Sequence, residues 1–196
     1  MVTTDKVSTR EAKRLRTRER LLGAAIAEFK RSGMADADVA AIVAAAGVAH
    51  GTFFFHFATK EHVLLELERR EEDRIAHQLD RYLRAGHDLH ALLSETVRQV
   101  LSLKRRLGPL LFKDFLALHF SQTRPPADED HPLIVLVAAE IGRTQDAGDL
   151  AADVSPVNSA VFFLLGLYAL LTTISDWPTR DDMLDDFVTR TLRSMR

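Results

Sequence analysis

The sequence contains no cysteine among its 196 residues. This absence excludes a disulfide framework and any metal site built from thiolates, and it is in keeping with a reducing cytoplasm. Long hydrophobic runs are also missing. The longest, from Ala160 to Leu171, is shorter than the roughly 20 apolar residues that a transmembrane helix needs. No apolar segment follows the charged N-terminus, as it would in a secretory signal. The composition therefore predicts a cytoplasmic protein without a membrane span.

The motifs of common enzyme active sites are missing as well. The sequence has no phosphate-binding glycine loop, no Ser-His-Asp order and no His-Glu-x-x-His zinc motif. The eight histidines are scattered, and the pair His87 and His90 supplies too few ligands to hold a metal ion. We therefore expect no enzymatic activity, no cofactor and no metal site.

Charge is distributed unevenly along the chain. Residues 1–60 contain ten Lys or Arg against six Asp or Glu, for a net charge of +4. The remaining residues contain sixteen against twenty-two, for a net charge of −6. A basic segment at one end of an acidic body is typical of a protein whose basic end meets a polyanion. The alternative is a chance scatter of charges, which the position of the excess argues against.

The stretch from Asp38 to Phe57 predicts two short helices around a tight turn. Asp38 can cap the first helix, because its carboxylate can accept hydrogen bonds from the free N–H groups of the first turn. Gly47 ends that helix, since glycine readily adopts the left-handed conformation of a helix end. His50 begins the second helix. Two helices in this arrangement form a helix-turn-helix, whose second helix enters the major groove of DNA.

The second helix carries four phenylalanines in two sets. Phe53 and Phe57 are four residues apart, so they share the face that we expect to be buried. Phe54 and Phe55 then point away from the core, where two large apolar side chains need a partner. Base edges with thymine methyl groups and the phosphate backbone are suitable partners.

The residues that flank the two motif helices add polar and cationic groups. A basic arm, Arg10 to Arg20, leads into the first helix, and Lys60 begins the helix after the motif. A phosphate at that helix N-terminus would satisfy both the lysine and the free N–H groups. For any single residue of the arm, the alternative is a solvated surface charge. We expect DNA contacts from ten residues: Arg16, Thr17, Arg18, Ala49, His50, Thr52, Phe54, Phe55, His56 and Lys60.

Several short motifs occur together at fixed spacing in the first third of the chain. They are the segment from Thr17 to Gly33, then Ala46-Gly47-Val48, Gly51-Thr52-Phe53, His56-Phe57 and Lys60-Glu61. In order and spacing they resemble the TetR family of bacterial transcriptional regulators. The resemblance implies a dimeric, ligand-responsive regulator, by default a repressor, that binds a palindromic DNA operator and is released by a small effector.

Two positions depart from the pattern of that family. Phe54 stands where the family usually has a tyrosine whose hydroxyl contacts a phosphate, and His50 stands where lysine or arginine is common. The charge of a histidine near neutral pH depends on its surroundings. The resemblance therefore implies that His56 takes over the phosphate contact or that the affinity for DNA is reduced.

The rest of the chain reads as helices, with no stretch of period-2 alternation. We expect an all-α protein of about nine helices, with a DNA-binding domain at residues 1–58 and a ligand-binding and dimerisation domain at residues 59–196. The helices predicted after the motif span residues 60–83, 89–107, 110–119 or 120, 132–146, 156–174 and 180–194. A loop is expected at residues 121–130, which include Pro125-Pro126.

The helix at residues 156–174 is apolar on all sides, which predicts that it is buried on all sides. One chain covers only part of such a helix, so a second copy of the chain is the expected cover for the rest. The alternative is burial within one subunit. In the resembled family the last two helices form the dimer interface. The residues expected there are Val161, Leu164, Leu165, Tyr168, Leu184 and Phe187.

Aromatic residues on the middle helices suggest a cavity for a small, largely apolar effector. The residues expected to line it are Phe112, Phe115, His119, Phe162 and Tyr168. The alternative for each of them is an ordinary core position. The sequence leaves open whether the effector releases or promotes DNA binding. The second functional hypothesis is a small-molecule-binding helical protein whose N-terminal domain contacts protein rather than DNA.

Overall fold

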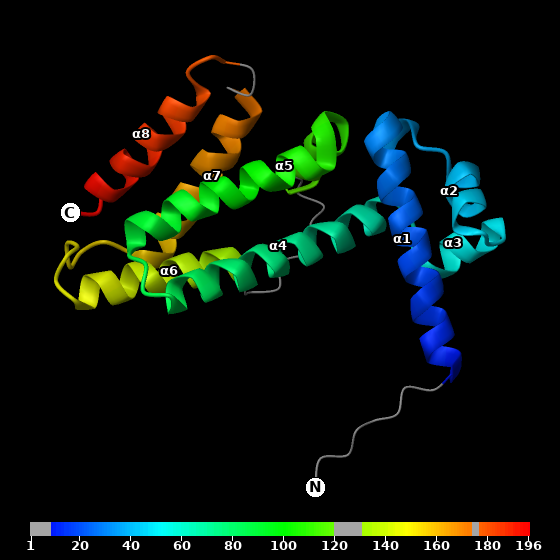
Figure 1. The fold of residues 1–196 in the computed structure, drawn as a ribbon, viewed down its shortest axis with the longest axis horizontal. Helices are drawn as coiled ribbons and strands as arrows, with labels where there is room; N and C mark the ends of the chain where they lie inside the picture. Colours follow the sequence, from blue (N-terminus) through cyan, green and yellow to red (C-terminus); the bar gives the residue numbers. More distant parts are fainter. Residues whose placement is uncertain (1–8, 120–130, 174–176) are drawn as a thin grey trace, which may run out of the picture. The chain divides into compact units, whose positions relative to one another are not determined.

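A computed structural model of the chain describes residues 9–119, 131–173 and 177–196. These residues form eight helices and no strand (Figure 1), so the expected all-α class is confirmed. The helices are α1 (Thr9–Asp36), α2 (Val39–Ala46), α3 (His50–His56), α4 (Lys60–Arg84), α5 (Leu89–His119), α6 (Pro132–Asp146), α7 (Pro156–Thr173) and α8 (Arg180–Arg193). The loop predicted at residues 121–130 lies outside the described residues.

The predicted break at Gly108-Pro109 is confirmed, because two helical segments meet there across a kink and together form the element α5. Gly108 is the residue at which α5 bends, with φ 75° and ψ 170°. The next residue, Pro109, lacks an N–H group but suits the first turn of a helix. One glycine is therefore enough to redirect the chain, and the helix resumes without an intervening loop.

The chain divides into two compact units, and each is described by itself. The first unit comprises Met1–Leu67 with Leu107–Leu118. The second comprises Glu68–Arg106 with His119–Arg196. The part of α5 that follows the bend therefore belongs with the N-terminal helices. The functional boundary after residue 58 stays a prediction.

In the first unit α1 packs against α2, and α2 packs against α3. Apolar side chains from all three helices and from the first turns of α4 build the core. Its fully buried members include Leu21, Phe29, Ile42, Phe53, Phe57 and Leu64. Burial of one such side chain contributes about 1.5–3 kcal/mol. The core therefore holds α3 by Phe53 within the helix and by Phe57 directly after it.

The turn between α2 and α3 has the predicted local chemistry. Asp38 Oδ1 accepts a hydrogen bond of 2.8 Å from the Ala40 N–H, which caps α2. Gly47 has φ 63° and ψ 44°, so it adopts the left-handed conformation that ends the helix. The Val48 N–H donates to the Val43 carbonyl at 3.0 Å. These bonds satisfy the free backbone groups that the ends of a short helix would otherwise leave exposed.

The second unit contains most of α4 and α5 together with α6, α7 and α8. Within it α6 packs against α7, and α7 packs against α8. The approach of α7 to α8 is close at Gly166, where an added Cβ would lie 2.8 Å from two ring atoms of Phe187. The Phe187 ring also stacks on Phe163, with 5.5 Å between the ring centroids. Glycine at position 166 therefore allows a phenylalanine of α8 to lie directly on α7.

As expected for a single chain, α7 is buried on one face only, and its cover by a second copy stays a prediction. Leu164, Leu167 and Tyr168 are buried, whereas Phe162 is 70% exposed and Val157 is 56% exposed. One face of the helix packs into the second unit because α6 and α8 cover only that face. α7 is also the one described helix that is long and apolar enough for a membrane span, a test that core helices of soluble proteins pass too.

Candidate functional site

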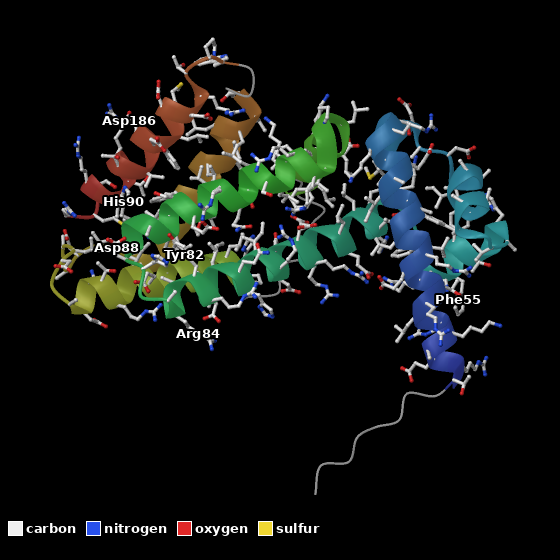
Figure 2. The ribbon with its side chains drawn as sticks, in the orientation of Figure 1. Phe55, Tyr82, Arg84, Asp88, His90 and Asp186 are labelled. Carbon is white, nitrogen blue, oxygen red and sulfur yellow. The ribbon has the colours of Figure 1, made fainter. Side chains whose placement is uncertain are left out.

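Helix α3 presents two aromatic rings on the surface of the first unit. Phe55 is 75% exposed and Phe54 is 50% exposed, while Phe53 is fully buried. The labelled Phe55 projects from α3 in Figure 2. Successive residues of a helix are about 100° apart, so burial of Phe53 turns its two successors toward the outside. The predicted division of the four phenylalanines is therefore confirmed.

Neighbouring rings hold the exposed phenylalanines in place. Phe54 lies against His50, with 5.6 Å between the ring centroids, and makes an edge contact of 5.3 Å with Phe53. Phe55 makes an edge contact of 5.2 Å with His56. Aromatic pairs favour such tilted and edge-on arrangements. Each exposed ring therefore has at least one aromatic neighbour.

Arg18, a predicted DNA contact, holds the first unit together internally. Its guanidinium donates hydrogen bonds to the His56 carbonyl oxygen and to the Glu66 carboxylate. It also lies over the Phe57 ring, with 4.1 Å from Cζ to the ring centroid. This side chain therefore joins α1 to the end of α3 and to α4. Two of its five N–H donors are used in this way, and its predicted contact with DNA stays a prediction.

His56 lies beside this arginine at the end of α3. Burial lowers the pKa of the imidazole, and the positive charges of Arg18 and Arg14 lower it further. These effects favour the neutral imidazole, which still has one N–H donor, so the phosphate contact of His56 stays a prediction. The same electrostatic effect shows that Arg14, from the basic arm, adds positive potential beside the C-terminal end of α3.

Lys60 reaches back to the end of α1. Its Nζ donates to the carbonyl oxygens of Ala35, at 2.8 Å, and Ala37, at 3.2 Å. A phosphate is predicted here because a positive lysine is unfavourable at the N-terminus of a helix. The two carbonyl groups already offset this unfavourable interaction. An ammonium has three N–H donors, so one remains for the predicted phosphate contact.

The remaining predicted DNA contacts are accessible in the first unit. Ala49 and His50 at the start of α3 are exposed, and Thr52 is half-buried. In α1 Arg16 is exposed and Thr17 is half-buried. The structure thus leaves the predicted contacts of α3 at least partly accessible around the side of the helix away from Phe53, and it leaves Arg16 exposed. Their contact with DNA stays a prediction.

A carboxylate that sequence reasoning missed fixes the end of α1. Asp114, in the part of α5 after the bend, accepts a hydrogen bond of 2.6 Å from the Met34 N–H. Met34 follows Gly33, whose φ of 78° turns the backbone out of the helix. The two residues are 80 positions apart in sequence. In the sequence, Asp114 resembles any polar residue on the exposed face of a helix, so no local pattern predicts this contact.

The predicted effector-pocket residues fall in both units, and the pocket that they were expected to form stays a prediction. Phe112 and Phe115 are buried in the first unit, where their rings stack with 6.4 Å between the centroids. Tyr168 is buried in the second unit, and Phe162 is exposed there. His119 ends α5, and its side chain lies outside the described residues. Phe112 and Phe115 therefore serve as core residues of the unit that contains α3, because the bend at Gly108 redirects their helix.

A surface cavity of about 410 Å³ that is largely open to solvent lies elsewhere in the second unit. α5 and α8 provide most of its walls, and Tyr82 near the end of α4 provides the rest. Tyr82 and His90 are labelled in Figure 2. The lining combines an apolar floor with polar and charged groups and consists of Tyr82, His90, Ala91, Ser94, Glu95, Val97, Arg98, Leu101, Arg105, Asp181, Leu184 and Asp185. None of the five predicted pocket residues is among them.

Glu95 is the buried charge in this lining. It is 7% exposed, pairs with Arg98, and accepts a hydrogen bond of 2.6 Å from Gln99. A buried carboxylate requires such partners, because desolvation of an unpaired charge is costly. No group of three or more side chains in the described part of the chain could hold a metal ion.

The predicted dimer residues fall into two sets. Leu164, Tyr168 and Leu184 are buried within one chain. Leu165 is 43% exposed, and Val161 and Phe187 are half-buried. The apolar surface that α7 leaves accessible is therefore formed by Val157, Val161, Phe162 and Leu165, which we name the α7 face.

Comparison with known proteins agrees with the fold and with the N-terminal motif. Residues 21–67 match the family described as bacterial regulatory proteins, tetR family. The resemblance predicted from the sequence is thus confirmed over these residues. Regulators of this family are DNA-binding proteins without enzymatic activity, as we expected for this chain. A search of curated protein sequences finds no significant match.

Solved structures of such regulators have the same fold. FadR from Thermus thermophilus, a TetR-family transcriptional repressor solved with lauroyl-CoA, is 25% identical, with a TM-score of 0.66 and coverage of 90% of this chain and 91% of that one. A putative tetR-family regulator from Shewanella sp. PV-4 is 22% identical, with a TM-score of 0.68 and coverage of 91% and 97%. RolR, solved with resorcinol, is 20% identical, with a TM-score of 0.68 and coverage of 94% and 89%.

The contacts of Arg18 predict that Arg18→Ala weakens the fold, whereas Arg16→Ala does not. Loss of the bonds to Glu66 and to the His56 carbonyl should lower the free energy of unfolding by about 1–2 kcal/mol, after allowance for partial exposure. Arg16→Ala, an exposed change in the same helix, should stay within about 0.5 kcal/mol of the wild type. Urea unfolding measures both values. Equal stability of the two variants would contradict an internal role for Arg18.

The lowered pKa of His56 predicts that the protein loses stability on mild acidification. The unfolded chain binds the proton more tightly than the folded one, so the free energy of unfolding falls as pH drops below about 6.5. Above that pH His56 is neutral in both the folded and the unfolded chain, so it no longer makes the free energy of unfolding depend on pH. Unfolding curves at pH 7.5 and 5.5 should show a smaller loss for His56→Gln than for the wild type. Parallel losses would rule out this histidine as a cause.

Proposed function

Because residues 21–67 carry the DNA-binding domain of the TetR family, we propose that this chain is a dimeric, ligand-responsive transcriptional repressor of the bacterial cytoplasm. The observation that carries the proposal is the orientation of α3, which buries Phe53 and presents Phe54, Phe55 and His50. A helix held in this way at the surface of a helix-turn-helix is suited to the major groove. The net positive charge of residues 1–60 supports the same assignment.

Two copies of the chain would place two α3 helices on one duplex. A palindromic operator repeats its half-site about 34–36 Å away, one turn of the duplex, or at a multiple of that distance. Arg16, Thr17, Thr52 and the remaining N–H of Lys60 are the proposed phosphate contacts. Such contacts set the position of the protein on the duplex and make affinity depend on salt.

The α7 face supports dimerisation. Phe162 and Leu165 are large apolar side chains exposed close together, and Val157 extends the surface by about two turns. Contiguous exposed apolar surface of this kind commonly marks an interface. Phe187 of α8, which lies on Gly166, flanks the same part of the helix. We assign the dimer contact to the accessible members of the predicted set, Val161, Leu165 and Phe187, together with Val157 and Phe162.

The cavity beside Tyr82 is the proposed effector site. Its floor contains Val97, Leu101 and Leu184, and its walls carry Arg98 and Arg105. A lining of this kind suits a ligand with an apolar body and a polar or charged group, so the largely apolar effector predicted from the sequence is refined in this respect. That lauroyl-CoA and resorcinol occur in regulators of similar fold supports a small-molecule ligand of some kind.

α4 offers a physical route from effector to DNA. It begins at Lys60, four residues after α3 ends at His56, and Tyr82 near its other end lines the cavity. A ligand that shifts Tyr82 would tilt α4, and in a dimer opposed tilts change the separation of the two α3 helices. Release on ligand binding is the proposed direction.

The proposal predicts salt-dependent binding of a palindromic duplex. Duplexes selected from a random pool at low salt should share an inverted repeat. Thr52→Ala and Arg16→Ala should each weaken binding to every sequence. Only Arg16→Ala removes a charge, so only this variant should reduce the slope of log K against log salt, by about 1. If no duplex is enriched and the N-terminal domain binds a protein instead, the alternative of a protein-contact domain replaces this one.

The α7 face predicts a dimer that a single charge disrupts. Leu165→Glu and Phe162→Glu should convert a dimer into a monomer in sedimentation at micromolar concentration, because an unpaired charge would be buried in the interface. Val135→Glu, at a half-exposed valine of α6, is the matched control and should leave the dimer intact. A wild-type protein that sediments as a monomer would exclude dimerisation through this face.

Coupling between effector and operator must be reciprocal. Screening by thermal shift identifies a ligand, and calorimetry then measures its affinity with and without saturating operator. The expected ratio is about 5–150-fold, the usual range for coupled sites. Leu101→Trp, which fills the cavity floor, should abolish ligand binding and leave operator affinity unchanged. Equal ligand affinities in the two titrations would leave a DNA-binding protein without a switch.

A further inference from the structure

The composition of α3 restricts how it can recognise a base. Its seven residues are His50, Gly51, Thr52, Phe53, Phe54, Phe55 and His56. The helix has no arginine or lysine for the bidentate contact to guanine, no asparagine or glutamine for adenine, and no carboxylate for cytosine. Among the standard base contacts, the one that a phenylalanine makes is apolar contact with the C5-methyl group of thymine.

Phe54 and Phe55 have the exposure and the neighbouring rings that suit such a contact. Both rings are at least half exposed, and Phe55 is the most exposed large apolar side chain in the described residues. His50 and Phe53 support the Phe54 ring, and His56 supports the Phe55 ring. A ring that is already positioned loses little rotational freedom when it binds.

The surroundings favour a nucleic acid over an apolar protein surface as the partner of these rings. Arg14 and Arg18 lie close enough to the end of α3 to act electrostatically on His56. Arg16, two residues from each of them on α1, is exposed. Apolar rings flanked by cationic groups match a major groove, where methyl groups lie between two rows of phosphates.

We propose that Phe54 and Phe55 read thymine methyl groups, so that each operator half-site has thymines at the base pairs that face α3. The inference rests on the proposed function and adds the chemistry by which the operator is chosen. Burial of one methyl group corresponds to about a fourfold change in affinity. Two methyl contacts in each half-site would therefore separate the operator from a methyl-free duplex by more than a hundredfold in the dimer.

The test replaces thymine with deoxyuridine in a duplex selected by the wild-type protein. Deoxyuridine lacks only the C5-methyl group and keeps all hydrogen bonds of the base pair. Each thymine of one half-site is replaced in turn, and affinity is measured at fixed salt. Replacement at one or two positions should lower the affinity about fourfold, and replacement at the other positions should change the affinity little. At a position that responds, the T·A pair is also changed to C·G. The duplex that contains 5-methylcytosine there should bind the protein more tightly than the duplex that contains cytosine.

Variants assign the effect to the rings. Phe55→Ala and Phe54→Ala should each bring the thymine-to-deoxyuridine affinity ratio to about 1 at one responding position. Both side chains are exposed, so the melting temperature should remain close to that of the wild type. Leu15→Ala, at an exposed leucine of α1, is the matched control and should keep the ratio unchanged.

The possible outcomes separate this inference from the proposed function. Tight duplex binding with a ratio of 1 at every position would overturn the inference and leave the regulator intact. A ratio above 1 that persists in both phenylalanine variants would overturn it as well, because other residues or the shape of the duplex would then sense the methyl groups. Absence of any duplex binding at low salt, with a protein captured by the two rings, would overturn both.

Discussion

Burial of Phe53 and Phe57 is the constraint on which the DNA-binding surface depends. Each ring is almost completely removed from water, and each contributes about 1.5–3 kcal/mol by burial. A helix of seven residues is too short to be stable by its own hydrogen bonds. Packing of these two rings therefore both forms α3 and sets its rotation. The rotation in turn places Phe54 and Phe55 outside, where a partner can reach them.

Charged side chains reinforce this arrangement from within the first unit. Arg18 joins α1 to α3 and α4, and Lys60 binds the carbonyl groups at the end of α1. Asp114 accepts the Met34 N–H at the same end. Part of the basic character of the N-terminal segment thus serves cohesion, and the exposed remainder, such as Arg16, is available for phosphate. Net charge alone does not distinguish the two uses.

The helices were predictable because their signals are local. Asp38 caps α2, Gly47 ends it, and Phe53 and Phe57 share a buried face, and each of these follows from residues within one or two turns. The surroundings of the aromatic residues on the middle helices were not predictable in the same way. Whether Phe112 is core or cavity depends on which helices surround it, and a kink at Gly108 assigns it to the unit that contains α3.

The sequence by itself determined the helical class, the helix-turn-helix and the division of α3 into a buried and a presented face. Backbone geometry and side-chain periodicity act over a few residues, so a short stretch contains all the information they need. Tertiary structure decided the roles of Arg18, Lys60 and Asp114, the face of α7 that stays exposed, and the position of the cavity. These depend on contacts between residues up to 80 positions apart. Such contacts arise from packing of whole helices, which no local pattern records.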